Sequence, residues 1–150
     1  MTKHYDKAYF DTWYRQRGIG DPKRLARKVA LAVATAEYHL ERPVRTVLDI
    51  GCGEGAWRAP LLKLRPKLHY LDARELDRGL PGLAELCGGV AFLETFTRED
   101  RAVGDEHEFQ QRPASFYRRR FAALGFEQLG SHCWLSPALQ GQATALETCG

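Results

Sequence analysis

The chain is 150 residues long, 44% hydrophobic and 11% aromatic, and carries a formal net charge of +3 at pH 7. A chain of this length is expected to form one globular domain over residues 1–150, with a substantial core. No apolar run approaches the roughly 20 residues that cross a bilayer. The small net charge gives no reason to expect a nucleic-acid partner.

The N-terminal segment Tyr5–Tyr14 is rich in aromatic residues. The N-terminus lacks the apolar core of a secretory signal, so the sequence predicts a cytoplasmic protein. Because no C-x-x-C pair occurs, the cysteines are predicted to be reduced thiols, not zinc ligands or disulfides. These cysteines are Cys52, Cys87, Cys133 and Cys149.

The first predicted helix runs from Asp21 to Glu41. Asp21 is a good capping residue and Pro22 suits the first helical position. Apolar residues recur at helical spacing and form a buried stripe, namely Leu25, Val29, Ala32, Val33, Ala36 and Leu40. Pro43 ends this helix, and a strand is predicted from Arg45 to Ile50.

This strand leads into a glycine-rich turn, with the sequence Val47-Leu48-Asp49-Ile50-Gly51-Cys52-Gly53-Glu54-Gly55-Ala56. Glycine adopts positive φ at little cost and leaves room for a ligand to approach the backbone. A helix that starts at such a turn also presents free N–H groups. The run therefore predicts a nucleotide-like ligand site, with a helix from Glu54 to about Leu64.

Two cofactor classes fit this turn. Gly51, Gly53 and Ala56 satisfy the G-x-G-x-x-G/A spacing of dinucleotide-binding proteins. Asp49 argues against a dinucleotide, because a carboxylate two residues before the first glycine repels a pyrophosphate. The same carboxylate can pair with an ammonium group, and S-adenosylmethionine carries an ammonium group as well as a sulfonium cation.

At these residues the chain resembles the class I S-adenosylmethionine-dependent methyltransferases, whose first motif reads much like Val47–Gly55. The resemblance implies a three-layer, Rossmann-like α/β fold and S-adenosylmethionine as the cofactor. It covers Tyr5–Pro66 and His69–Leu135. The residues that it places at the cofactor are Trp13, Asp49, Gly51, Cys52, Gly53, Glu54, Gly55 and Asp72.

Methyltransferases of this family fold an N-terminal segment over the cofactor. The resemblance thus implies that residues 1–20 form a lid, with Trp13 as its anchor. Aromatic rings suit this role, since they exclude water and make cation–π contacts with a sulfonium. The alternative is that the rings of Tyr5–Tyr14 simply dock on the scaffold.

The middle of the chain allows two alignments with the family. In the first, Leu68–Asp72 is the second strand and Asp72 accepts hydrogen bonds from the ribose hydroxyls. In the second, which we favour, His69–Leu76 matches the loop and helix after the fourth strand, and Gly88–Glu94 is the fifth strand. The second alignment removes the residues that hold ribose and adenine.

The remaining elements are a helical region from Ala73 to Cys87, a strand Val90–Phe96, a helix from Pro113 to Leu124 and a strand Phe126–Leu135. Residues 136–150 are predicted to fray. Only about four strands can be counted, whereas the family has seven. The sequence therefore predicts an abbreviated, mostly parallel sheet.

Three smaller features carry reactive or metal-binding residue types. His69 is a candidate general base if it lies at a strand end above the cofactor. Asp105–Glu108 contains metal-ligand chemistry, but neighbouring side chains on a loop do not converge on one ion, so no metal site is predicted. Cys52 has no histidine at a spacing that implies a nucleophilic pair, and packing is its expected role in the turn.

The sequence thus predicts an S-adenosylmethionine-dependent methyltransferase that acts on an unidentified, small-molecule acceptor. Catalysis would consist mostly of alignment and exclusion of water, because the sulfonium already activates the methyl group. The main alternative is a non-enzymatic, shortened methyltransferase-like remnant with weak or no cofactor binding. A nicotinamide oxidoreductase is a further alternative that Asp49 disfavours.

Overall fold

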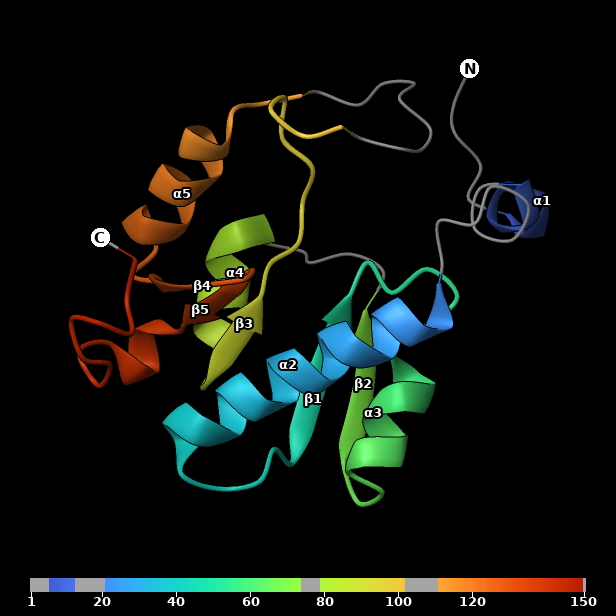
Figure 1. Cartoon of the computed structure of the whole chain (residues 1–150), viewed down its shortest axis with the longest axis horizontal. Coiled ribbons are helices and arrows are strands. Elements are labelled where there is room, and N and C mark those ends of the chain that lie inside the picture. Colours follow the sequence, from blue (N-terminus) through green and yellow to red (C-terminus); the bar gives the residue numbers. More distant parts are fainter. Residues whose placement is uncertain (1–5, 13–20, 74–78, 102–110, 150) are drawn as a thin grey trace.

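The computed structural model describes residues 6–12, 21–73, 79–101 and 111–149. Helices and strands alternate along most of this length (Figure 1). In chain order, the elements are α1 (Lys7–Phe10), α2 (Pro22–Leu40), β1 (Thr46–Ile50), α3 (Arg58–Leu64), β2 (His69–Ala73), α4 (Gly79–Leu86), β3 (Val90–Phe92), α5 (Ala114–Ala123), β4 (Glu127–Gly130), β5 (Cys133–Leu135) and the short 3-10 helix η2 (Pro137–Leu139).

The strands form two small sheets. β1 and β2 are parallel, in a register that pairs Thr46 with His69 and Ile50 with Ala73. The second sheet has the order β3-β5-β4, and both of its pairings are antiparallel. The mixed α/β class predicted from the sequence is confirmed. The prediction of a mostly parallel sheet is wrong, because two of the three strand pairs are antiparallel.

Two predicted strands are shorter or divided. β3 covers Val90–Phe92 only, where a strand to Phe96 was predicted. The segment predicted as one strand from Phe126 to Leu135 is a hairpin, β4 and β5. The chain reverses there through three consecutive residues with positive φ, Gly130 (89°), Ser131 (48°) and His132 (68°).

α2 agrees closely with its prediction. The Asp21 carboxylate accepts a hydrogen bond from the Lys23 N–H at 2.9 Å, and Pro22 occupies the first turn. Val29, Val33 and Ala36 are buried along one side. At the other end, Glu41 takes a left-handed conformation with φ 50°, which closes the helix.

The remaining helices differ at their ends. α3 begins at Arg58, not at Glu54, because positive φ at the glycines up to Gly55 is incompatible with a helix. In the region predicted to be helical from Ala73, the structure has Ala73 in β2 and a helix at Gly79–Leu86, and residues 74–78 lie outside the described part. α5 keeps its predicted place.

The core has two parts. α2 and α3 pack on one face of the β1–β2 pair, around Val29, Val33, Leu61 and Leu68. α4 and α5 pack on the second sheet, around Ala91, Phe121, Phe126 and Trp134. α2 also passes in front of β3 (Figure 1), where an added Cβ at Gly89 would lie 3.3 Å from Leu40.

The second sheet has helices on both faces. On β5, Trp134 contacts α5 through Phe121, with ring centroids 5.1 Å apart. Its neighbour Cys133 is hydrogen-bonded to Thr35 of α2. Because successive strand residues point to opposite faces, α2 and α5 must cover opposite faces of this sheet.

The face of the β1–β2 pair opposite α2 and α3 is more open. Val47 and Tyr70 pack into the core on the α2 side. Leu48 and Leu71 are register partners that point the other way, and they are 36% and 42% exposed. Two neighbouring leucines thus form an apolar ladder that the described residues leave partly uncovered.

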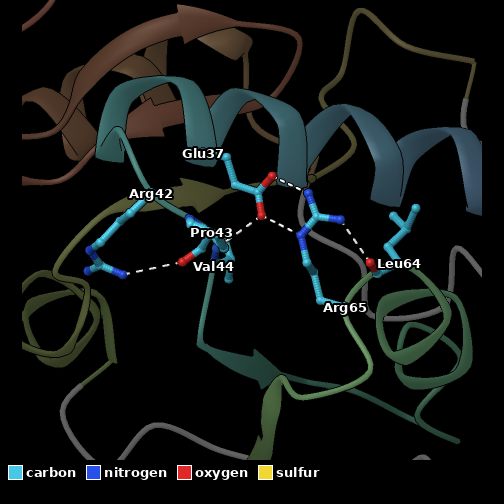
Figure 2. A network of polar contacts seen from close by, with 6 residues as sticks. All are labelled: Glu37, Arg42, Pro43, Val44, Leu64 and Arg65. Atoms are coloured by element: carbon cyan, nitrogen blue, oxygen red, sulfur yellow. Dashed lines mark hydrogen bonds and ion pairs between the residues drawn. The ribbon is translucent and has the colours of Figure 1, made fainter.

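A polar cluster joins the end of α2 to α3 and β1 (Figure 2). Glu37 Oε1 accepts hydrogen bonds from Arg65 Nε at 2.6 Å and from the Val44 N–H at 3.0 Å. Its other oxygen forms an ion pair with Arg65 Nη2. Arg65 in turn donates to the Leu64 carbonyl at 2.8 Å. One carboxylate therefore links three elements.

The tail that follows β5 makes hydrogen bonds to distant parts of the chain. The Ser136 N–H donates to the Gly89 carbonyl at 2.8 Å, and the Cys149 N–H donates to the Gln128 carbonyl at 2.8 Å. The Tyr38 hydroxyl of α2 donates to the Glu147 carboxylate. Within the described residues, no helix is long and apolar enough to span a membrane.

Candidate functional site

The turn after β1 contains three glycines in the left-handed region. The φ angles of Gly51, Gly53 and Gly55 are 67°, 55° and 71°. The Gly55 N–H donates to the Cys52 carbonyl at 2.8 Å, and the Arg58 N–H donates to the Gly55 carbonyl at 3.0 Å. Other residues adopt this conformation only at a cost, so the glycine spacing is explained by the backbone that it forms.

Two aspartates lie at the same edge as this turn. Asp49 precedes the last residue of β1, and its register partner on β2 is Asp72. The strands are parallel and joined through α3, so their carboxyl ends meet at one edge, where α/β proteins place ligands. The structure thereby brings together Asp49, Asp72 and the glycine turn, which the sequence analysis assigned to one site.

Tyr70 is a part of this site that the sequence analysis missed. Its hydroxyl donates a hydrogen bond to Asp49 Oδ2. The guanidinium of Arg58, at the start of α3, lies 5.7 Å from the centroid of the Tyr70 ring. A Cβ added at Gly55 would lie 3.9 Å from the same hydroxyl. Tyr70 therefore contacts β1, α3 and the turn.

The electrostatic environment of Asp49 has opposing contributions. Burial raises the pKa of Asp49 above its ordinary value, and the nearby Asp72 carboxylate raises it further, whereas the Tyr70 hydrogen bond lowers it. The pKa of Tyr70 is also raised, first by burial and then by its contact with Asp49. Tyr70 therefore remains a hydrogen-bond donor throughout the neutral pH range.

The described part of the N-terminal segment reaches the turn. Asp6 caps α1 by accepting a hydrogen bond from the Tyr9 N–H at 2.9 Å. A Cβ added at Gly53 would lie 3.1 Å from the Phe10 ring. Phe10 thus lies directly against the turn. Trp13, the residue expected to anchor the lid, is outside the described residues.

Cys52 and Glu54 both lie within the turn, as expected. The Cys52 side chain is half-buried, and its Sγ lies 3.9 Å from the Gly53 carbonyl oxygen. Glu54 is exposed. Gly51 has open space where a Cβ would project, with no atom within 4 Å. The turn therefore offers room beside its backbone.

His69 does not meet the condition set for a general base. It begins β2 and pairs with Thr46 at the amino end of β1. The glycine turn is at the carboxyl end, four residues further along the strand, or about 13 Å at the rise of a strand. Strand direction therefore places His69 at the amino end of the strand pair, away from the glycine turn, and its role as a general base stays a prediction.

The favoured alignment of the middle segment is also corrected. It treated His69–Leu76 as a loop and helix, but His69–Ala73 is a strand paired with β1. In Figure 1, β1 lies between β2 and β3. The ring centroids of Trp57, just after the turn, and Phe92 of β3 are 5.1 Å apart. The parallel pairing of β2 with β1 agrees with the other alignment, in which Leu68–Asp72 is the second strand.

The Asp105–Glu108 cluster lies outside the described residues, which resume at 111. Among the described residues, no three His, Cys, Asp or Glu side chains are grouped so as to hold a metal ion. No family model, curated protein or solved structure matches the chain. The site itself therefore carries the functional argument.

Proposed function

We propose that this chain is an abbreviated, Rossmann-like domain that binds S-adenosylmethionine and transfers its methyl group to a small-molecule acceptor. One observation carries the proposal. A turn with three positive-φ glycines follows a parallel strand, and Asp49 and Asp72 lie side by side at the same edge. Glycine backbone and paired carboxylates together favour a cationic, nucleoside-containing ligand over a dinucleotide.

The residues present fit this cofactor. Asp49 Oδ2 is engaged by Tyr70, and among the described residues Oδ1 has no partner, so it is available to a ligand ammonium group. The open space beside Gly51 admits the methionine portion close to the backbone. Asp72 is exposed at the end of β2, in the position from which a carboxylate accepts hydrogen bonds from ribose hydroxyls.

When bound, S-adenosylmethionine supplies a methyl group already activated by the sulfonium charge. The chain would contribute alignment and exclusion of water. Phe10 lies against Gly53, and its assigned role is to cover the methionine end. No described residue is assigned as a base.

The alternative function is a non-enzymatic remnant of the same fold, with weak or no cofactor binding. The observation that favours it is the small sheet: β1 pairs with β2 alone among the described strands, and the Leu48–Leu71 ladder is partly exposed. A nucleotide pocket usually relies on a more extensive sheet. The alternative thus keeps the glycine turn but assigns it no reaction.

Calorimetric titration of the purified chain separates these functions. S-adenosylmethionine should give a saturable heat, and oxidised nicotinamide dinucleotide should give none, since Asp49 and Asp72 repel its pyrophosphate. Binding of the dinucleotide alone would contradict the proposal and restore an oxidoreductase. Absence of heat with both ligands would favour the remnant.

A further inference from the structure

Tyr70 occupies a position that packing alone does not explain. Its ring belongs to the core shared by α2, α3 and β1, while its hydroxyl reaches the edge of the sheet and donates to Asp49. Tyr70 and Asp72 are on the same face of β2, two residues apart, and Asp49 lies opposite Asp72. The Tyr70 hydroxyl, on a side chain whose ring packs in the core, is thus a direct hydrogen-bond partner of the Asp49 carboxylate.

We propose that Tyr70 makes the site selective for a ligand that carries an ammonium group, by holding the Asp49 carboxylate with one oxygen occupied and the other directed to the ligand. This inference rests on the proposed function and identifies what positions its amino-group contact. Tyr70 acts through Asp49 and is therefore a positioning residue. Its own hydroxyl contacts the carboxylate and not the reacting atoms.

The charges around Asp49 explain why such a residue is needed. Burial disfavours the charged form of Asp49, and Asp72, which faces it across the strand pair, repels that charge, so both favour the neutral acid. A neutral acid cannot form an ion pair with an ammonium group. The Tyr70 hydrogen bond opposes both effects by favouring the ionised form.

The other groups near this pair come from the turn and from α3. Cys52 of the turn is a minor contributor to the raised pKa of Tyr70, and the Arg58 guanidinium lies over the Tyr70 ring. Asp72 acts on both members of the Asp49–Tyr70 pair. Of the hydrogen bonds between described residues, the one from the Tyr70 hydroxyl is the one that the Asp49 carboxylate accepts.

The test is Tyr70→Phe, which removes the hydroxyl and keeps the ring and its packing. Two thioether ligands are titrated into wild type and variant: S-adenosylhomocysteine, which carries an ammonium group, and 5′-methylthioadenosine, which lacks the amino-acid portion. At pH 7 the variant should lose about tenfold in affinity for the first ligand, the effect of one hydrogen bond to a charged group. It should bind the second ligand within about twofold of wild type.

The pH profile adds a readout that a merely structural role would not change. Wild-type affinity for S-adenosylhomocysteine falls as pH decreases through the pKa of Asp49. Removal of the Tyr70 donor raises that pKa, so the fall should begin at a higher pH in the variant. Tyr117→Phe, at a half-buried tyrosine in the other core, is the matched control and should leave both affinities and the profile unchanged.

Equal losses for both ligands, or a Tyr70→Phe profile identical to that of wild type, would overturn the assignment of Tyr70. Such results would leave the proposed function intact, because wild type would still bind the ligands. Failure of wild type to bind either ligand would instead overturn the proposed function and, with it, this inference.

Discussion

The turn after β1 restricts which residues it can contain. Gly51 has φ 67° with nothing within 4 Å of an added Cβ, whereas the same addition at Gly53 meets Phe10. A side chain at Gly51 would thus cost backbone strain without a clash, and it would project into the space assigned to the ligand. Gly141 combines the same features, φ 77° and open surroundings, far along the chain.

Gly51→Ala and Gly141→Ala are therefore a matched pair. Both should lower the free energy of unfolding by about 1–2 kcal/mol, because each places Cβ in the left-handed region. Only Gly51→Ala should also abolish S-adenosylmethionine binding. Chemical denaturation and calorimetric titration measure the two effects separately. Comparable binding by both variants would show that the ligand does not approach Gly51.

At this scale, the sequence indicates residues whose role depends on local spacing. The glycines and Asp49 are adjacent in the chain, so their arrangement follows from one strand and one turn. Tyr70 is 21 residues from Asp49, and their contact depends on the parallel register of β1 and β2. The sequence does place Tyr70 on the same strand face as Asp72, because the two are two residues apart. The contact with Asp49 can be predicted only once the register of β1 and β2 is known.

At the scale of elements, the Glu37 cluster joins the end of α2 to Val44, which precedes β1, and to Arg65, which lies between α3 and β2. Its contacts with Arg65 lower the pKa of Glu37, against the smaller opposing effect of burial. A group whose pKa is lower in the folded state than in the unfolded state stabilises the fold above its unfolded pKa. That stabilisation is lost as pH falls through the folded-state pKa.

Glu37→Gln should therefore lower the thermal midpoint at pH 7, on the order of 2–4 °C for a loss of about 1 kcal/mol in a domain of this size. The difference from wild type should shrink as pH falls below about 4.3, the ordinary pKa of glutamate. Thermal melts followed by circular dichroism over pH 3–7 measure this. A difference that stays constant with pH would contradict the assigned role of the carboxylate.

α1 is the described part of the proposed lid. Its contact with Gly53 predicts that amide exchange in residues 6–12 slows when S-adenosylmethionine is added, because the bound ligand would give Phe10 a second surface. Hydrogen exchange with mass spectrometry measures this, and η2 provides an internal reference that should not change. Equal exchange of residues 6–12 with and without ligand would count against a lid.

Elements were predicted well where local signals coincide and poorly where they compete. α2 has a capping residue, a proline at its start and a long apolar stripe, and its limits were confirmed. The segment predicted as one strand from Phe126 to Leu135 is divided because Gly130 and Ser131 favour a turn, and the prediction did not use that signal. The position of His69 depends on the direction of its strand, which residue types alone do not specify.

For the whole molecule, the two sheets are connected by α2 and by side chains, and no backbone ladder joins them among the described strands. One such side-chain contact joins Trp57, just before α3, and Phe92 of β3, whose ring centroids are 5.1 Å apart. The number of strands was predicted approximately, but not their division into two sheets. Pairing of this kind depends on contacts distant in sequence, which no local pattern specifies.

The arrangement of β3 also affects the order in which the chain can be assembled. β1, α3 and β2 are consecutive. Among the described strands β3 pairs with β5 alone, and about forty residues separate Phe92 from Cys133. At a synthesis rate of about 5–20 residues per second, β3 leaves the ribosome roughly 2–8 seconds before its partner. During that interval β1, α3 and β2 can already fold, while β3 remains an unpaired edge until β5 has been synthesised.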